Sequence, residues 1–190
     1  MATETVVFKV TGKRPLIQNN PASMGGGQGE KKVGRKTIPT PEAEAAGKVY
    51  RLPSGQLYIK SEAFRGALIK AASGLRVGKT PAKMILAAGV LFPEEFCPLY
   101  SPDKKAKPIT DYAIYTCRAV VQRQGVLRSR PRIEAWACDV VVEIDLDIVT
   151  PDLLLDFFKR AGTHIGVGDQ RPGAPMTPGP FGTFTVSLAD

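Results

Sequence analysis

Several features that would assign a chemistry outright are scarce in this sequence. It has 3 cysteines and 1 histidine among 190 residues, which are too few and too scattered for a disulfide framework or a zinc site. No apolar run approaches the length of a membrane span, and the first residues lack the pattern of a signal peptide. We therefore expect a protein of the cytoplasm of a prokaryotic or infected host cell, with buried free thiols, no metal and no cofactor.

A nucleotide-binding glycine motif is also missing, although residues 166–168 resemble the beginning of one. A dinucleotide loop needs a strand before it and a helix after it, so that the phosphate meets a helix N-terminus. Here residues 150–162 have the pattern of a helix and residues 181–188 the pattern of a strand. Arg171 stands where the third glycine of the motif would fall. No catalytic constellation is evident, and we expect that the protein is not an enzyme.

What the sequence does contain is an excess of positive charge. Lysine and arginine number 26 against 18 acidic residues, which gives a formal net charge of +8. A basic surface of this size favours polyanions, of which nucleic acid is the commonest. Residues 19–47 are rich in glycine, proline and lysine and have no periodicity, so we expect a mobile insertion that acts as a flexible basic arm.

Hydrophobic periodicity predicts a single α+β domain over residues 1–190. Alternating apolar residues indicate four strands, and helical spacing indicates two long helices. In chain order these span 5–10 (strand), 61–75 (helix), 111–125 (strand), 136–146 (strand), 150–162 (helix) and 181–188 (strand). This order is that of a ferredoxin-like β-α-β-β-α-β core, which also underlies the RNA-recognition domain. The base-stacking aromatic residues of that domain are missing from the predicted strands.

Three segments of the chain together carry a family pattern. They are "GKRPLIQNN" after the first strand, "LYIKSEAFRGALIKAA" across the first helix and "IGVGDQRPG…GPFGTFTV" near the end. In this order they resemble the RAMP superfamily, the RNA-binding proteins of CRISPR effector complexes, and above all the backbone subunit that polymerises along guide RNA. The third segment is longer and richer in proline than the family pattern. A small virus-borne or CRISPR-independent relative fits the length of the chain equally well.

The resemblance implies a function. The protein would bind single-stranded nucleic acid, RNA first, largely without reading its sequence, and it would assemble with further copies along the strand or with other effector-complex subunits. Ser61, Arg65 and Gly66 occupy the family's positions in the helix motif. Glycines of the late loop would let the backbone approach RNA closely. The family also projects a thumb-like hairpin, whose tip we expect at about residues 122–133.

Basic and amide side chains complete the expected interface. An arginine-rich finger between two strands suits phosphates and stacked bases, and amides can bond bases or ribose. The expected nucleic-acid-binding residues are Asn19, Lys31, Lys32, Arg35, Lys36, Ser61, Arg65, Gly66, Lys70, Arg118, Arg123, Arg128, Arg130, Arg132, His164, Gly166, Gly168, Gln170 and Arg171. A solvated surface is the competing interpretation for most of these positions.

Acidic residues have two expected places. Alternation along the strand 136–146 and just past its end puts four acidic residues on a solvent face, where they could also meet a basic hairpin of another copy: Asp139, Glu143, Asp145 and Asp147. Asp169 could pair with Arg171 and so shape the glycine-rich loop.

Three other functions stay open. A guide-RNA-processing endoribonuclease would use His164 as its general base, whereas the family's catalytic histidine normally lies near the first helix. An assembly or adaptor protein would use its basic surface to bind an acidic protein. A viral protein that binds single-stranded DNA is compatible as well, because phosphate contacts and stacking serve both nucleic acids.

Overall fold

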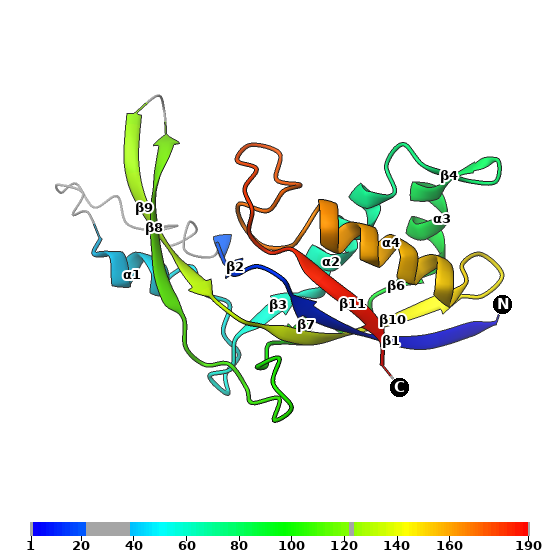
Figure 1. Cartoon of the computed structure of the whole chain (residues 1–190), viewed down its shortest axis with the longest axis horizontal. Coiled ribbons are helices and arrows are strands. Elements are labelled where there is room, and N and C mark those ends of the chain that lie inside the picture. The colour runs from blue at the N-terminus through cyan, green and yellow to red at the C-terminus, as the bar shows by residue number, and fades with distance from the viewer. Residues whose placement is uncertain (1, 22–38, 122–123, 190) are drawn as a thin grey trace, which may run out of the picture.

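A four-stranded antiparallel sheet lies at the centre of the molecule. The computed structural model describes residues 2–21, 39–121 and 124–189, so the predicted binding residues Lys31, Lys32, Arg35, Lys36 and Arg123 lie outside the described part. The strands of this sheet follow the order β11-β1-β10-β6 (Figure 1). Their bounds are β1 Thr3–Gly12, β6 Val90–Leu91, β10 Ala137–Asp145 and β11 Phe184–Leu188.

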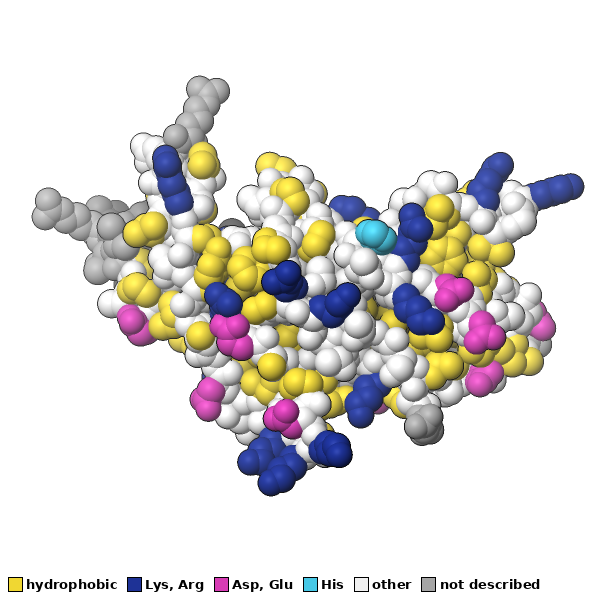
Figure 2. Space-filling view, in the orientation of Figure 1, with side chains coloured by type: hydrophobic (Ala, Val, Ile, Leu, Met, Phe, Trp, Pro, Cys, Tyr) yellow, Lys and Arg dark blue, Asp and Glu magenta, His cyan; other side chains and the backbone are white. Residues whose placement is uncertain are grey.

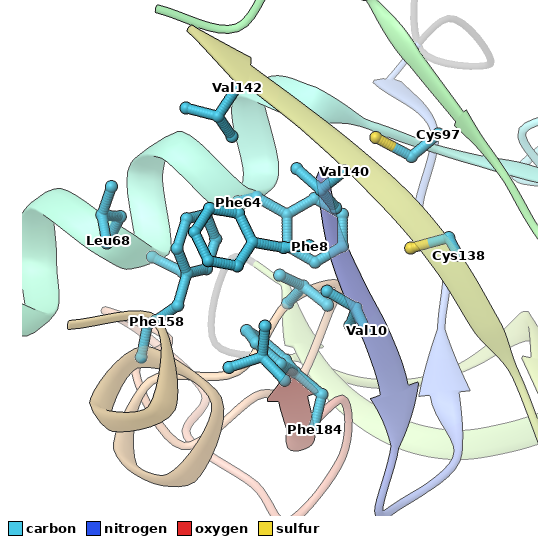
Figure 3. Close-up of a cluster of buried hydrophobic side chains, with 14 of the residues drawn as sticks. Phe8, Val10, Phe64, Leu68, Cys97, Cys138, Val140, Val142, Phe158 and Phe184 are labelled. Carbon is cyan, nitrogen blue, oxygen red and sulfur yellow. The ribbon is translucent and has the colours of Figure 1, made fainter. Parts of the chain in front are cut away.

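Helices α2 (Ser61–Ala71) and α4 (Pro151–His164) pack together on one face of this sheet, and the aromatic core lies beneath them. Phe8 pairs with Val140 across the two central strands, and both side chains are fully buried. The ring of Phe158 extends from α4 toward Phe8, and the centroids of the two rings lie 4.7 Å apart (Figure 3). The other face is open: Lys9 pairs there with Asp139, and both are exposed, as alternation predicts.

The local sequence explains why α4 forms where it does. The Thr150 hydroxyl accepts a hydrogen bond from the Leu153 N–H at 3.3 Å, and proline occupies the first turn. The helix continues past Gly162, which the sequence pattern places at its end. A side chain at Gly162 would collide with the backbone carbonyl of Phe184. Gly162 therefore serves the close packing of the helix on β11, rather than helix termination.

The strand predicted at 111–125 does not join the central sheet. It forms β8 (Ala113–Val121), which pairs with β9 (Gln124–Ile133) in a long hairpin, and β9 pairs in turn with β2 (Leu16–Ile17). The second strand of the central sheet is instead β6, of two residues. The apolar alternation along β8 belongs to a hairpin strand whose side chains from Ala113 to Val120 are at most half-buried. Because β9 begins at Gln124, the hairpin tip is also shorter than the predicted 122–133.

Smaller elements surround this frame. Helix α1 (Pro41–Ala46) lies within the insertion predicted at 19–47 and packs against β9, so the prediction of an unstructured segment does not hold for these residues. Helix α3 (Ala82–Gly89) contacts α2. The short strands form two pairs, β3 (Tyr58–Lys60) with β7 (Phe96–Pro98) and β4 (Arg76–Val77) with β5 (Thr80–Pro81).

The expected α+β class is confirmed, with antiparallel sheets and four helices in the described residues.

All three cysteines are free thiols. Cys97 and Cys138 are buried, and burial raises the pKa of the Cys97 thiol to about 12. Cys117, expected in the core, is half-buried on the hairpin instead. None of the helices in the described ranges is long and apolar enough to cross a membrane.

Candidate nucleic-acid interface

A cavity of about 370 Å³ opens where three distant parts of the sequence meet. Its walls come from β2 and the residues just after it, from the end of β3 with the first turns of α2, and from residues 167–171. These parts coincide with the three segments that carry the family resemblance. Four of the predicted binding residues line the cavity together: Asn19, Gly66, Gly168 and Arg171.

The glycine-rich loop, residues 165–183, folds tightly against β2. Gly166, Gly168 and Gly182 have φ values of +71°, +80° and +66°, a region that favours glycine. The Asp169 N–H donates to the Ile17 carbonyl at 2.8 Å, and a side chain at Gly168 would lie 2.6 Å from that same oxygen. The conformational freedom of these glycines is therefore used within the chain. Their approach to nucleic acid stays a prediction.

Gly66 has a different environment. It is exposed on α2. Apart from its two chain neighbours and the nearby backbone of the helix itself, no heavy atom of the described residues lies within 4 Å of where its side chain would begin. Glycine inside a helix costs about 1 kcal/mol relative to alanine, and no packing contact in this part of the chain requires it. The open space over Gly66 faces the cavity, where a ligand could approach the helix backbone closely.

The other predicted residues of α2 lie in three different environments. Arg65 is exposed, and its guanidinium has no ion pair in the described part of the chain. Ser61 is buried, and its N–H donates to the Glu95 carbonyl at 2.9 Å. The Lys70 ammonium donates to the Gly173 carbonyl and so ties the helix to the glycine-rich loop. Of these three, Arg65 is the one available to a phosphate.

Asp169 joins the glycine-rich loop to the hairpin. Its carboxylate lies 2.7 Å from the Arg130 guanidinium, so the expected pairing with Arg171 is wrong. Arg171 instead donates to the Gly168 carbonyl at 2.6 Å, because the loop turns back on itself there. Gln170 reaches the hairpin as well, and its amide donates to the Cys117 sulfur at 3.1 Å.

The three arginines of β9 are all engaged within the chain. Arg130 pairs with Asp169, Arg128 lies 3.3 Å from Glu44 of α1, and Arg132 lies 2.8 Å from Glu134. The register places Arg118 opposite Leu127 on the other face of the hairpin, where it is exposed and has no ion pair among the described residues. The arginine finger predicted from sequence therefore exposes fewer free charges than its composition indicates.

The polar groups of the cavity divide into bonded and free ones. The buried Gln18 amide donates to the Tyr58 carbonyl and accepts from the Tyr50 N–H, each at 2.8 Å. Burial, with a smaller effect of Tyr58, raises the pKa of Tyr50, so its phenol stays protonated at neutral pH. The side chains of Asn19 and Glu62 are exposed and have no hydrogen bond or ion pair within the described ranges.

Lys60, Glu62 and Tyr50 are among the lining residues that sequence reasoning missed. Lys60 and Glu62 flank Ser61 of the helix motif, and that position could have identified them. The Lys60 ammonium lies 3.8 Å from Glu95. No sequence motif marks Tyr50, because only folding of the chain brings this residue to the cavity. His164 lies exposed in the last turn of α4 and does not line the cavity.

Figure 2 shows how charge is distributed over one face of the molecule. Lys and Arg side chains are spread across several elements of this face, and the outer parts of the hairpin and of the glycine-rich loop stand apart from each other. Within the described residues, no group of three or more histidine, cysteine or acidic side chains could hold a metal ion.

Comparison with known proteins identifies the fold. No protein-family model matches the sequence, and no curated protein matches it. A chain in the cryo-EM structure of the Type III-B Cmr-beta bound to cognate target RNA superposes with a TM-score of 0.60 at 10% identity, over 98% of this chain and 60% of that one. The crystal structure of Cmr6 from Pyrococcus furiosus gives a TM-score of 0.44 at 12% identity, over 98% and 100%. The protein therefore has the fold of the Cmr-beta chain and spans about 60% of its length.

Proposed function

We propose that this chain is a non-catalytic RAMP-type protein that binds single-stranded RNA in the cavity between β2, α2 and the glycine-rich loop. The observation that carries the proposal is the convergence of three motif segments, far apart in sequence, on one cavity. Its core is then a ferredoxin-like one in which β6 serves as a short second strand. The Cmr-beta chain with the similar fold belongs to a structure that contains target RNA, which supports RNA as the ligand.

The contacts that we propose are mainly to the RNA backbone. Arg65 and Arg118 are exposed cations without ion pairs in the described part of the chain, and Arg171 lines the cavity. Over Gly66 a phosphate or ribose can approach the helix backbone. Lys13 and Arg14, both exposed, lie beside the loop because their N–H groups donate to the Thr183 carbonyl. Contacts of this kind fix a strand without reading its sequence.

We further propose that the protein assembles with other copies along the strand or with other effector-complex subunits, in the cytoplasm. The hairpin supports this proposal. It projects away from the central sheet (Figure 1) and carries two large apolar residues near its tip, Val120 and Leu127, each 72% exposed. Exposed apolar residues on a projecting element are typical of contacts with another molecule.

The proposal is tested by fluorescence-anisotropy titration of labelled single-stranded RNA, single-stranded DNA and duplex DNA at several salt concentrations. We expect the tightest binding for single-stranded RNA, with a log-log salt slope of about −0.7 for each phosphate contact. Cooperativity should increase with strand length, and the RNA should be recovered at full length. Lack of binding to any strand at moderate salt, or cleavage of the RNA, would overturn the proposal.

A further inference from the structure

The cavity is lined in part by apolar and aromatic residues, which a phosphate group would not contact favourably. The apolar lining residues Leu16, Ile59 and Val167 are buried, with at most 5% of each exposed, and the half-buried Tyr50, which carries an aromatic ring, also lines the cavity. That ring lies 5.5 Å from the Tyr58 ring, which packs edge-on against Phe96 at 4.7 Å, so a row of aromatic side chains supports it. A nucleobase has flat faces that suit apolar and aromatic walls, together with a polar edge that needs hydrogen-bond partners.

The free polar groups of the cavity suit such an edge. Glu62 and Asn19 are exposed at its walls and have no partner in the described part of the chain. The amide nitrogen and oxygen of Gln18, in contrast, are each bonded to a backbone group. Lys60 lies two residues before Glu62 in sequence and lines the same cavity. A free carboxylate repels phosphate but accepts hydrogen bonds from N–H groups. Glu62 therefore indicates a ligand with hydrogen-bond donors that enter the cavity.

We propose that the cavity holds one unpaired guanine of the bound strand, an inference that rests on the proposed RNA binding. The Watson–Crick edge of guanine presents two adjacent N–H donors, at N1 and N2, beside the O6 acceptor. Two adjacent donors match the two oxygens of one carboxylate, here Glu62. Adenine and cytosine present one amino group beside an acceptor, and uracil presents one N–H between two acceptors. Asn19 or Lys60 would donate to O6.

The size of the cavity agrees with this ligand. A cavity of about 370 Å³ lies in the range of small-molecule pockets, roughly 300–1,000 Å³. The other carboxylate at its wall, Asp169, is paired with Arg130 and is not available to a base. Glu62 is thus the free acidic group of the described cavity wall, and guanine selectivity should depend on it.

The experiment compares nine-nucleotide RNAs by fluorescence anisotropy. One strand is all uridine, and the others carry a single central guanosine, inosine, adenosine or cytidine. Since a bidentate base contact discriminates strongly, we expect the guanosine strand to bind about 10-fold or more tightly than each other strand. Inosine is the decisive comparison, because it differs from guanosine only by the missing 2-amino group. Equal affinities for all five strands would overturn the inference and leave the proposed RNA binding intact.

The variant Glu62→Gln tests whether the Glu62 carboxylate causes the preference for guanosine. It should lose the difference between the guanosine and inosine strands, and it should bind the all-uridine strand slightly more tightly because a negative charge is lost. Glu143→Gln, on the open face of the central sheet, is the matched control and should keep the preference. A preference that persists in Glu62→Gln contradicts the assignment. Failure of every strand to bind wild-type protein would instead overturn the proposed function.

Discussion

The carboxylate of Asp169 lies 2.7 Å from the guanidinium of Arg130, and this ion pair joins the glycine-rich loop to the hairpin. Both side chains are largely buried, with 20% and 14% of their surface exposed. Loss of one member would leave the other charge in a site with little water, which is costly. The pair therefore holds one wall of the cavity in position.

Arg130→Ala tests the structural role of this pair. We expect the free energy of unfolding to fall by about 1–3 kcal/mol, because the Asp169 carboxylate loses its charged partner. Urea denaturation measures the change, and the double variant with Asp169→Asn should show clear non-additivity. Arg118→Ala, an exposed arginine on the same hairpin, is the control and should change stability little. Equal stability of Arg130→Ala and Arg118→Ala would refute the role given to the pair.

Glu44 anchors α1 to the hairpin and should make stability depend on pH. Burial raises the pKa of its carboxyl, but hydrogen bonds from Lys48, the Ser129 N–H and Arg128 outweigh burial, and the net effect is a pKa below the ordinary value of 4.5. Because the folded-state pKa is depressed, this contribution is fully present above the ordinary value. It is lost as the pH falls through the folded-state pKa.

Glu44→Gln should therefore unfold more easily than wild type at pH 7, by about 1–3 kcal/mol. The difference should shrink as the solution is acidified below pH 4.5. Urea titrations across this pH range measure it, and Glu42→Gln, an exposed neighbour in the same helix, serves as the control. A stability difference that is the same at every pH would argue against the anchor.

Gly66→Ala separates folding from binding. Nothing in the described structure occupies the space of the new methyl group, so we expect stability to rise by up to about 1 kcal/mol. RNA affinity should fall, because the methyl group keeps the strand away from the helix backbone. In Gly89→Ala the methyl group would lie 2.8 Å from Val149, so that variant should lose stability. An unchanged RNA affinity of Gly66→Ala would exclude close approach at this site.

Arg65→Ala should weaken RNA binding through the loss of one phosphate contact. The log-log salt slope should become shallower by about 0.7, with little change in stability, because the side chain is exposed. Arg76→Ala, an exposed arginine on the β4–β5 hairpin, removes the same charge from an element that does not border the cavity, whereas Arg65 directly precedes the lining residue Gly66. Identical slopes for the two variants would mean that Arg65 contributes only to the general charge of the protein.

The sequence predicted the parts of the fold that depend on local pattern. The strands at β1, β10 and β11 and the helices α2 and α4 follow from alternation, spacing and capping. The prediction that β8 joins the central sheet is wrong. Its alternation fits a strand of that sheet and a strand of a separate hairpin equally well, and only pairing in the folded chain decides between these two positions. The two residues of β6 are too few to show any period.

Only part of the candidate site could be predicted from the sequence. The three motif segments could be found in the sequence, and Gly66, Gly168 and Arg171 do line one cavity. The ion pairs of Arg128, Arg130 and Arg132 could not be foreseen, because their partners come from α1, the glycine-rich loop and the chain after β9. Composition counts charges, whereas pairing across the fold decides which of them remain free.

Photo-crosslinking tests the central claim most directly. Single-stranded RNA with 4-thiouridine would be irradiated with the protein, and the crosslinked peptides identified by mass spectrometry. We predict crosslinks at Tyr50, in residues 59–66 and in residues 167–171, because these parts of the chain contain most of the residues that line the cavity. Crosslinks confined to the open face of the central sheet, around Lys9 and Val141, would contradict the account, because the strand would then bind without the cavity.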